Sequence, residues 1–152
     1  MNGLSLHDIG ESALALPVGV DTPAEELGVI AATRELYARR GYSHPWICYL
    51  AVLDTECIGT CGFTGPPSNG EVEIAYFTFP GHEGRGVATQ MARSLVEIAL
   101  KAEIPGLNLI AHTLPTRNAS TSILEKIGFQ HVADIEHEED GLVWKWARMP
   151  AP

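Results

Sequence analysis

The sequence predicts a mixed α/β domain, with a mostly antiparallel central sheet and helices on both faces of that sheet. The chain has 152 residues, the size of one domain, and its 45% hydrophobic content is enough for a single core. Helical and strand patterns follow one another in the order helix, three strands, helix, strand, helix, two strands. Short turns join the three consecutive strands, which is typical of an antiparallel meander. We therefore treat residues 1–152 as one domain.

The N-terminal part holds a segment that is hard to interpret and then a clear helix. Within residues 1–20, the stretch SALALPV predicts either a short strand or an ordered arm. The helix begins with Thr22 as its cap, Pro23 at the first helical position and Glu25 completing a capping box. Two arginines occupy its last turn, and Gly41 ends it.

The meander follows this helix. Asn69–Gly70, just before its third strand, is a strong hairpin signal. The predicted strands are Trp46–Leu53, Cys57–Phe63 and Glu71–Phe79.

The rest of the chain alternates helices and strands. A glycine-rich loop leads into an amphipathic helix, and a strand and a second helix come next. The chain then closes with two strands, HVADIE and LVWKWA, around a turn. The bounds predicted are Thr89–Ala102 for the first of these helices, Gly106–Thr113 for the strand, Asn118–Ile127 for the second helix and Glu138–Gly141 for the turn.

Composition excludes several classes of function. The net charge of −9 argues against a broad nucleic-acid surface and against an anionic membrane surface, but it suits a cationic or amine substrate. Cys48, Cys57 and Cys61 are odd in number and form no CxxC pair, so we expect reduced thiols and no metal site. The sequence shows no signal-peptide pattern and no apolar run of membrane-spanning length. These observations predict a cytoplasmic protein.

Three glycines at positions 81, 84 and 86 stand between the third strand and the next helix. Such a junction lets the backbone turn sharply, and the helix start offers free N–H groups to an anion such as phosphate. A tight turn without a ligand is the alternative. No Gly-Lys-Ser/Thr follows, and the GxGxxG spacing is absent, so an NTP-binding P-loop and a dinucleotide fingerprint are both excluded.

The loop resembles the acetyl-CoA loop of the GNAT superfamily, whose pattern is Gln/Arg-x-x-Gly-x-Gly/Ala between a strand and a helix. The matching residues are Glu83, Gly84, Arg85, Gly86, Val87 and Ala88, and Thr89 follows as it often does. Glu83 departs from the pattern, because Gln or Arg is usual there. We expect its side chain to point away from the pyrophosphate.

A second motif, AHTLPTRNASTSILEKIGF (Ala111–Phe129), resembles the branch that includes the ribosomal-protein-alanine N-acetyltransferases. The likeness spans about Trp46 to Trp146, whereas the usual first strand of the family is not evident in residues 1–20. The residues that carry it are Pro115, Asn118, Ser120, Leu124, Glu125, Lys126, Gly128 and Phe129.

The resemblance implies a site for acetyl-CoA and no metal. The strand Glu71–Phe79 would splay from its neighbour at a bulge, and the pantetheine arm would pair with it like an added strand. Amides from Gly84 to Thr89 would take the pyrophosphate, and Asn118 would contact the arm. Backbone groups near Phe77, Thr78 and Phe79 would bind the arm and polarise the thioester carbonyl.

Acetyl transfer to an amine needs a base for the ammonium and an acid for the leaving thiolate. Glu73 is the candidate base; the alternative is a solvated acidic strand edge. His112 is the second candidate, or else a histidine satisfied at a strand end. Ser120 is the candidate acid, although a serine at a helix start also bonds its own backbone. Tyr76 is the next candidate for that role.

Two hypotheses from different classes follow. The first is an enzyme that acetylates a primary amine, either a protein N-terminus or a small molecule, by direct attack in a ternary complex. The second is a CoA-binding sensor or regulatory module without catalysis. The family resemblance also allows a homodimer. Acidic residues expected on the acceptor side hint at a cationic acceptor; they are Glu25, Glu26, Glu138, Glu139 and Asp140.

Overall fold

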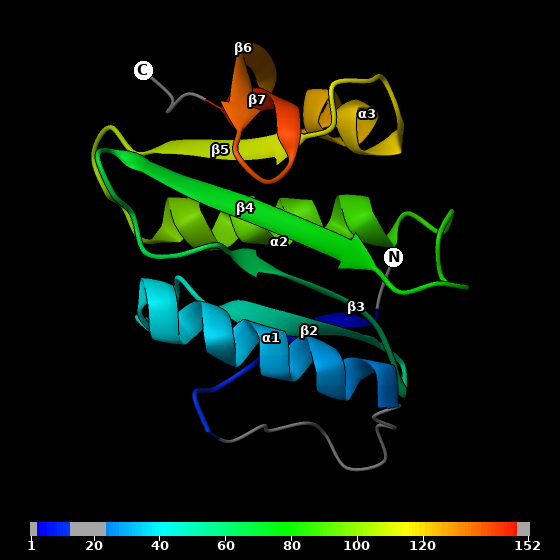
Figure 1. Cartoon of the computed structure of the whole chain (residues 1–152). Helices are drawn as coiled ribbons and strands as arrows, with labels where there is room; N and C mark the ends of the chain where they lie inside the picture. Colours follow the sequence, from blue (N-terminus) through cyan, green and yellow to red (C-terminus); the bar gives the residue numbers. More distant parts are fainter. Residues whose placement is uncertain (1–2, 13–23, 149–152) are drawn as a thin grey trace.

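The computed structural model describes residues 3–12 and 24–148, with the side chains of residues 24–27 left out (Figure 1). The described strands form one sheet in the order β1-β2-β3-β4-β5-β7-β6, antiparallel except for the β4–β5 pair. This confirms the predicted fold class. The strands are β1 (Leu4–Asp8), β2 (Cys48–Leu53), β3 (Glu56–Phe63), β4 (Glu71–Thr78), β5 (Asn108–Thr113), β6 (Gln130–His137) and β7 (Gly141–Arg148), and the helices are α1 (Ala24–Arg40), α2 (Val87–Lys101) and α3 (Ala119–Lys126).

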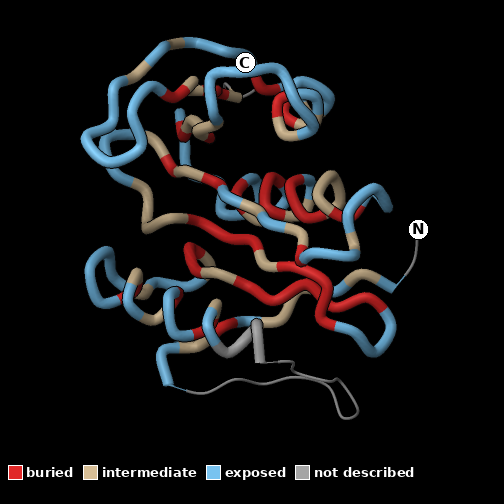
Figure 2. The backbone as a smooth tube through the Cα atoms, turned by 45° about the vertical axis from the view of Figure 1, so that its right-hand side comes forward, coloured by how far each residue is buried: buried red, intermediate tan, exposed pale blue. Residues whose placement is uncertain are grey.

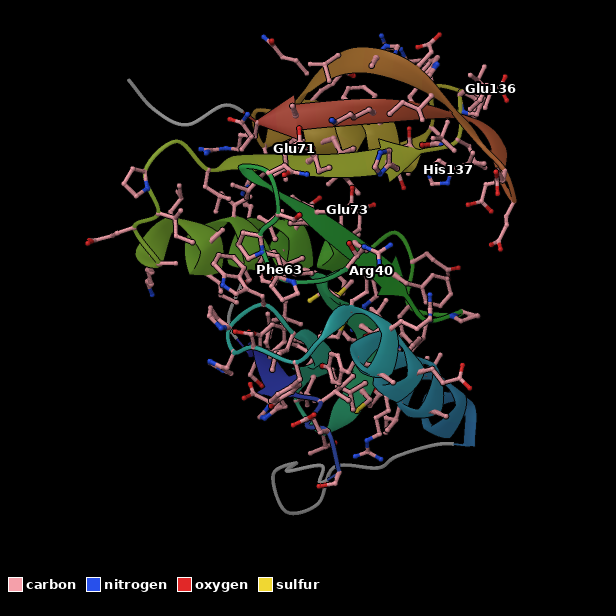
Figure 3. All side chains as sticks on the ribbon, turned by 60° about the vertical axis from the view of Figure 1, so that its left-hand side comes forward. Arg40, Phe63, Glu71, Glu73, Glu136 and His137 are labelled. Carbon is pink, nitrogen blue, oxygen red and sulfur yellow. The ribbon has the colours of Figure 1, made fainter. Side chains whose placement is uncertain are left out.

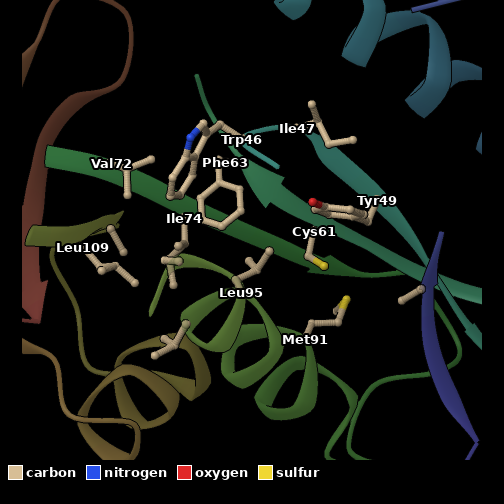
Figure 4. Packing of buried hydrophobic residues seen from close by; sticks show 14 of the residues in the cluster. Trp46, Ile47, Tyr49, Cys61, Phe63, Val72, Ile74, Met91, Leu95 and Leu109 are labelled. Atoms are coloured by element: carbon tan, nitrogen blue, oxygen red, sulfur yellow. The ribbon is translucent and has the colours of Figure 1, made fainter. Parts of the chain in front are cut away.

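Helices cover both faces of the sheet, with α1 in front of it and α2 behind it in Figure 1. On the α1 face, Ile30 packs with Leu50 and Val52 of β2 in a small buried cluster. On the α2 face, Met91 and Leu95 pack against the strands in a larger cluster, part of which is drawn in Figure 4. Burial is therefore concentrated in the central strands and along α2, as the red stretches of Figure 2 show.

The N-terminal strand is where the structure goes beyond the sequence pattern. β1 pairs antiparallel with β2, Leu4 opposite Leu53 and Asp8 opposite Tyr49, and so supplies the first strand that the sequence did not reveal. Apart from Ser12, the stretch SALALPV lies outside the described residues, as do Thr22 and Pro23 of the predicted helix cap.

Element ends differ from the predictions by a few residues. β2 begins at Cys48 because Trp46 and Ile47 form a bend before it. α2 begins at Val87, two residues before the predicted start at Thr89, because Gly86 takes the N-cap position.

The sheet opens between β4 and β5. These two strands pair over only three residue pairs, from Glu71 opposite Asn108 to Glu73 opposite Ile110. β4 nevertheless stays paired with β3 as far as Thr78, so its last five residues leave an open edge on the β5 side. The predicted splay is thus present. The register of β4 against β3 is unbroken, so the predicted bulge is absent there.

Candidate active site

A cavity of about 480 Å³ lies where the open edge of β4 meets the starts of α2 and α3. The structure brings most of the predicted cofactor residues together around it, although Arg85, Phe79 and Asn118 do not line it. The predicted residues in its lining are Phe77, Thr78, Gly84, Gly86, Val87, Ala88, Thr89 and Ser120, and Tyr76, His82, Glu83, Ala119 and Ile123 complete it.

The end of the glycine-rich loop and the first turn of α2 line this cavity. Gly81, Gly84 and Gly86 have φ values of 92°, 78° and 74°, in the left-handed region that side chains disfavour. Gly86 is the N-cap of α2 and offers no side-chain acceptor, and the first turn of the helix contains no acidic residue. The N–H groups of the first turn therefore lack partners within the helix, which makes this end suited to an anion.

The charged side chains of the loop bind within the loop itself. The N–H of Gly81 donates to Glu83 Oε1 at 2.8 Å, so this carboxylate is folded back onto its own backbone. Arg85 Nη1 lies 3.3 Å from His82 Nδ1, at an exposed position. That the Glu83 side chain points away from a bound pyrophosphate stays a prediction.

Hydrogen bonding to β3 fixes which backbone groups of β4 face the opening. The N–H of Phe79 donates to Ile58 O at 2.9 Å, and Glu73 O accepts from the N–H of Thr64 at 3.0 Å. Backbone direction alternates along a strand, so Phe77, like Phe79, directs its groups toward β3. The groups of Tyr76 and Thr78 point to the open edge instead. The backbone contacts with the pantetheine arm that were predicted at Phe77 and Phe79 are therefore expected at Tyr76 instead. The predicted contact at Thr78 is kept.

Asn118, not Ser120, caps α3. Its side-chain oxygen accepts from the N–H of Thr121 at 3.1 Å, while the N–H of Asn118 donates to Thr121 Oγ1 at 2.9 Å. Thr121 is fully buried whereas Asn118 is exposed, so both bonds are partly buried at the edge of the core. The capping role considered for Ser120 is therefore wrong. The Ser120 hydroxyl makes no hydrogen bond within the described part of the chain, and Ser120 lines the cavity.

The two candidates for the proton donor lie beside each other. The Tyr76 hydroxyl donates to Ser120 O at 3.4 Å. Burial raises the pKa of Tyr76 to about 12, so its hydroxyl keeps its proton at neutral pH.

The two candidates for the base form a pair. Glu73 Oε2 lies 2.9 Å from His112 Nδ1, and Thr64 Oγ1 donates to Glu73 Oε1 at 3.1 Å. The side chains of Glu73 and His112 are 26% and 20% exposed, so the pair is shielded from bulk water but remains accessible. The β4–β5 register places Glu73 opposite Ile110, and His112 follows two residues later on the same face.

A second cavity, of about 120 Å³, is lined by this Glu73–His112 pair. Tyr76 and Ser120 line it too, and they also line the larger cavity. Tyr76 and Ser120 therefore form a boundary that both cavities share. The groups able to donate a proton lie at this boundary, and the pair able to accept one lines the smaller cavity.

Two further features of the described residues bear on function. His, Cys, Asp and Glu side chains do not gather in threes there as a metal site would require, and the three cysteines form no disulfide. None of the described helices has both the length and the apolar character needed to cross a membrane.

The comparison with protein families matches residues 14–130 to the acetyltransferase (GNAT) domain. Solved structures with the same fold include the ribosomal L7/L12 alpha-N-protein acetyltransferase RimL without ligand, at 18% identity and a TM-score of 0.69, covering 99% of this chain and 92% of that one. RimL in complex with Coenzyme A gives 20% identity and a TM-score of 0.70, covering 98% and 95%. Mycobacterium smegmatis RimJ in complex with CoA-disulfide is 20% identical, with a TM-score of 0.63. That match covers 82% of this chain and 60% of the RimJ chain.

A curated relative is similar over a shorter stretch. The N-acetylaspartate synthetase of Xenopus tropicalis is 25% identical over 95 residues, which are 61% of this chain and 34% of that protein. The chain thus spans about a third of the length of this relative.

Proposed function

Since the chain belongs to the GNAT acetyltransferase family, we propose that it transfers the acetyl group of acetyl-CoA to a primary amine within a ternary complex. One observation carries this proposal: Tyr76 and Ser120 line both cavities. The larger cavity has a helix start suited to phosphate, and the smaller one holds a carboxylate–imidazole pair. Such an arrangement allows a proton to leave on one side of the transferred group and another to be delivered on the other side.

Acetyl-CoA would bind in the larger cavity. The amides from Gly84 to Thr89 would hold the pyrophosphate, because the α2 start has no side-chain cap that competes for them. The backbone groups of Tyr76 and Thr78 would pair with the pantetheine arm, since they point to the open edge of β4. Arg85 would add charge near the phosphates, and Asn118 stays a predicted contact of the arm.

The Glu73–His112 pair would take the proton of the acceptor ammonium. The neutral amine nitrogen would then bond to the carbonyl carbon as the carbon–sulfur bond breaks, giving a thiolate and an amide nitrogen with one extra proton. The nitrogen would release this second proton to solvent, which reprotonates the donor hydroxyl, and a neutral amide would remain. A backbone N–H of β4 would donate to the carbonyl oxygen as negative charge develops there. The thiolate would take a proton from the Ser120 hydroxyl or from the Tyr76 hydroxyl, which stays protonated at neutral pH.

The relatives point to two kinds of acceptor. RimL is named for the α-amine of a ribosomal protein, and the Xenopus tropicalis enzyme for an acetylated amino acid. Both acceptors are primary amines. The acceptor of this chain is therefore proposed to be a protein N-terminus or a small amine.

The proposal is tested by thiol release from acetyl-CoA against a panel of small amines, amino acids and peptides with free N-termini. We expect release that depends on an acceptor. Glu73→Gln should lower kcat by roughly 100-fold, because it removes the carboxylate of the pair while keeping its shape. Glu97→Gln, at an exposed position on α2, is the control and should act like the wild type.

A second measurement separates catalysis from binding. Calorimetry should give the same acetyl-CoA affinity for Glu73→Gln as for the wild type. Tight acetyl-CoA binding without thiol release for any acceptor would refute the enzyme and favour the CoA-binding sensor. A Glu73→Gln variant with full turnover would remove Glu73 from proton transfer.

A further inference from the structure

A third cavity, of about 250 Å³, adjoins Glu73 on the side of the α1 C-terminus. Arg40, the last residue of α1, lines it together with Thr64, Glu71 and Glu73. Figure 3 shows Glu73 between Glu71 and Arg40 in this region. A cavity of this size is smaller than the range of about 300–1,000 Å³ usual for drug-sized ligands, so it suits a small molecule.

The two carboxylates of this cavity already have partners. Lys145 Nζ donates to both oxygens of Glu71, at 3.2 and 2.9 Å. Glu73 accepts hydrogen bonds from Thr64 and binds His112. The Arg40 side chain, in contrast, makes no hydrogen bond or ion pair with any described residue. Its guanidinium is therefore available to an anionic group brought by a ligand.

The stem of Arg40 is supported although its end is exposed. A Cβ built on Gly65 would lie 3.3 Å from Arg40 Cβ and 3.8 Å from both Cγ and Cδ. The aliphatic stem of Arg40 thus lies along the backbone of Gly65, which has no side chain to displace it. A supported stem loses less rotamer freedom when the guanidinium binds a ligand.

We infer that the acceptor is a free amino acid, whose carboxylate binds Arg40 while its amine faces the Glu73–His112 pair. This inference rests on the proposed function and names the substrate class of the same site. Arg40 and Glu73 line one cavity, so a single small molecule can meet both. A guanidinium presents two parallel N–H groups that match the two oxygens of a carboxylate.

The charges around the cavity favour a singly charged carboxylate over a doubly charged phosphate. Lys145 offsets the charge of Glu71, but the Glu73 carboxylate would repel the phosphate more strongly than the carboxylate. A protein N-terminus has an amide where a free amino acid has its α-carboxylate, so it would leave Arg40 unpaired. The acidic residues alone predict a cationic acceptor. A free amino acid carries a positive ammonium group and a negative carboxylate.

The experiment compares alanine, leucine and aspartate with their C-terminal amides, by acetyl-CoA-dependent thiol release. The wild type should prefer each acid over its amide by about tenfold or more in kcat/KM. Arg40→Gln should lower kcat/KM for the acids by a similar factor, mostly through KM, and leave the amides unchanged. Arg40→Lys should retain part of the preference, because it keeps the charge but not the two parallel donors.

Arg39→Gln is the matched control, because Arg39 is an exposed arginine of the same helix turn that does not line the cavity. It should behave like the wild type with every acceptor. Equal use of acids and amides by the wild type would overturn the inference. So would an equal loss for acids and amides in Arg40→Gln, or a peptide N-terminus preferred over every free amino acid.

A binding measurement distinguishes this failure from failure of the proposed function. Calorimetry of the same acids and amides, with CoA present, needs no turnover. The wild type could bind the acids without releasing any thiol, while Arg40→Gln fails to bind them. That result would support the amino-acid site and refute the transferase. Thiol release with amides and peptides but without binding of free amino acids would refute only the amino-acid site.

Discussion

Two helices begin at the same cavity, and they begin in different ways. α3 has Asn118 as its N-cap, and reciprocal bonds between Asn118 and Thr121 give the N–H of Thr121 a side-chain acceptor. α2 starts at Gly86, in the left-handed conformation and without any side-chain cap. A capped start serves the stability of the fold, whereas an uncapped start leaves its N–H groups for a ligand. Under the proposed function, the α2 start would bind the cofactor, and the Asn118 cap would stabilise the fold.

The largest effect is expected at Ser120, which lies just inside the capped helix but does not cap it. Ser120→Ala should lower kcat by roughly 100-fold if the hydroxyl protonates the thiolate. Its free energy of unfolding should stay within about 0.5 kcal/mol of the wild type, because Asn118 supplies the cap. Turnover and denaturant unfolding measured on one preparation check both statements. Full activity in Ser120→Ala, with a large loss in Tyr76→Phe, would transfer the role to Tyr76.

The second-largest effect is expected at Gly86, the uncapped start of α2. Gly86→Val forces a β-branched residue to a φ of 74°, so the loop should shift and acetyl-CoA affinity should fall by roughly tenfold or more. Gly106→Val is a matched control, since Gly106 has a φ of 71° and, like Gly86, has no neighbour within 4 Å of an added Cβ. It should lose similar stability and keep its acetyl-CoA affinity. Equal affinities in the two variants would contradict the assignment of the loop.

The third-largest effect is expected at Asn118, the N-cap of α3. Asn118→Ala should cost about 1 kcal/mol in the free energy of unfolding, because the N–H of Thr121 loses its acceptor. Asn118→Ser should recover most of this loss, since serine is also a good N-cap. Denaturant midpoints measure the difference. If acetyl-CoA affinity falls in both variants while stability recovers in Asn118→Ser, Asn118 also contacts the cofactor.

The smallest effect is expected at Glu83. Glu83→Gln keeps an oxygen that can accept from the N–H of Gly81, so the loop should keep its shape. It also removes a negative charge from the lining of the cavity, and acetyl-CoA affinity should stay equal or rise by about two- to threefold. Calorimetry at low ionic strength gives the most sensitive reading. A marked loss of affinity would show that the carboxylate has a direct role.

Local sequence patterns predicted most of the fold. The hairpin signal at Asn69–Gly70 and the helical stripe containing Met91 and Leu95 each reflect chemistry within a short segment, and both elements are present. β1 was missed because its apolar–polar alternation, LSLH, extends over only four residues and is too short to identify a strand by itself. It becomes a strand through its pairing with β2, which lies more than 40 residues away in the chain.

The site was predicted less completely, because its geometry depends on contacts between distant segments. Glu73 and His112 were separate candidates for one role, and only the β4–β5 register reveals that they form a pair. The capping roles of Asn118 and Ser120 depend on the residue at which α3 begins, and a propensity pattern does not fix a helix start to one residue. Arg40 had no local signal beyond its place in the last helical turn, since its position opposite Glu73 is set by the tertiary fold.

The short pairing between β4 and β5 gives this sheet an inner edge in addition to its two outer ones. The amide hydrogens of Tyr76 and Thr78 point to that edge and should exchange with solvent deuterium faster than those of Phe77 and Phe79, which bond to β3. An extended molecule that pairs with the edge would protect the first two amides and leave the other two almost unchanged. Alternate protection along one strand would therefore identify which ligands complete the sheet.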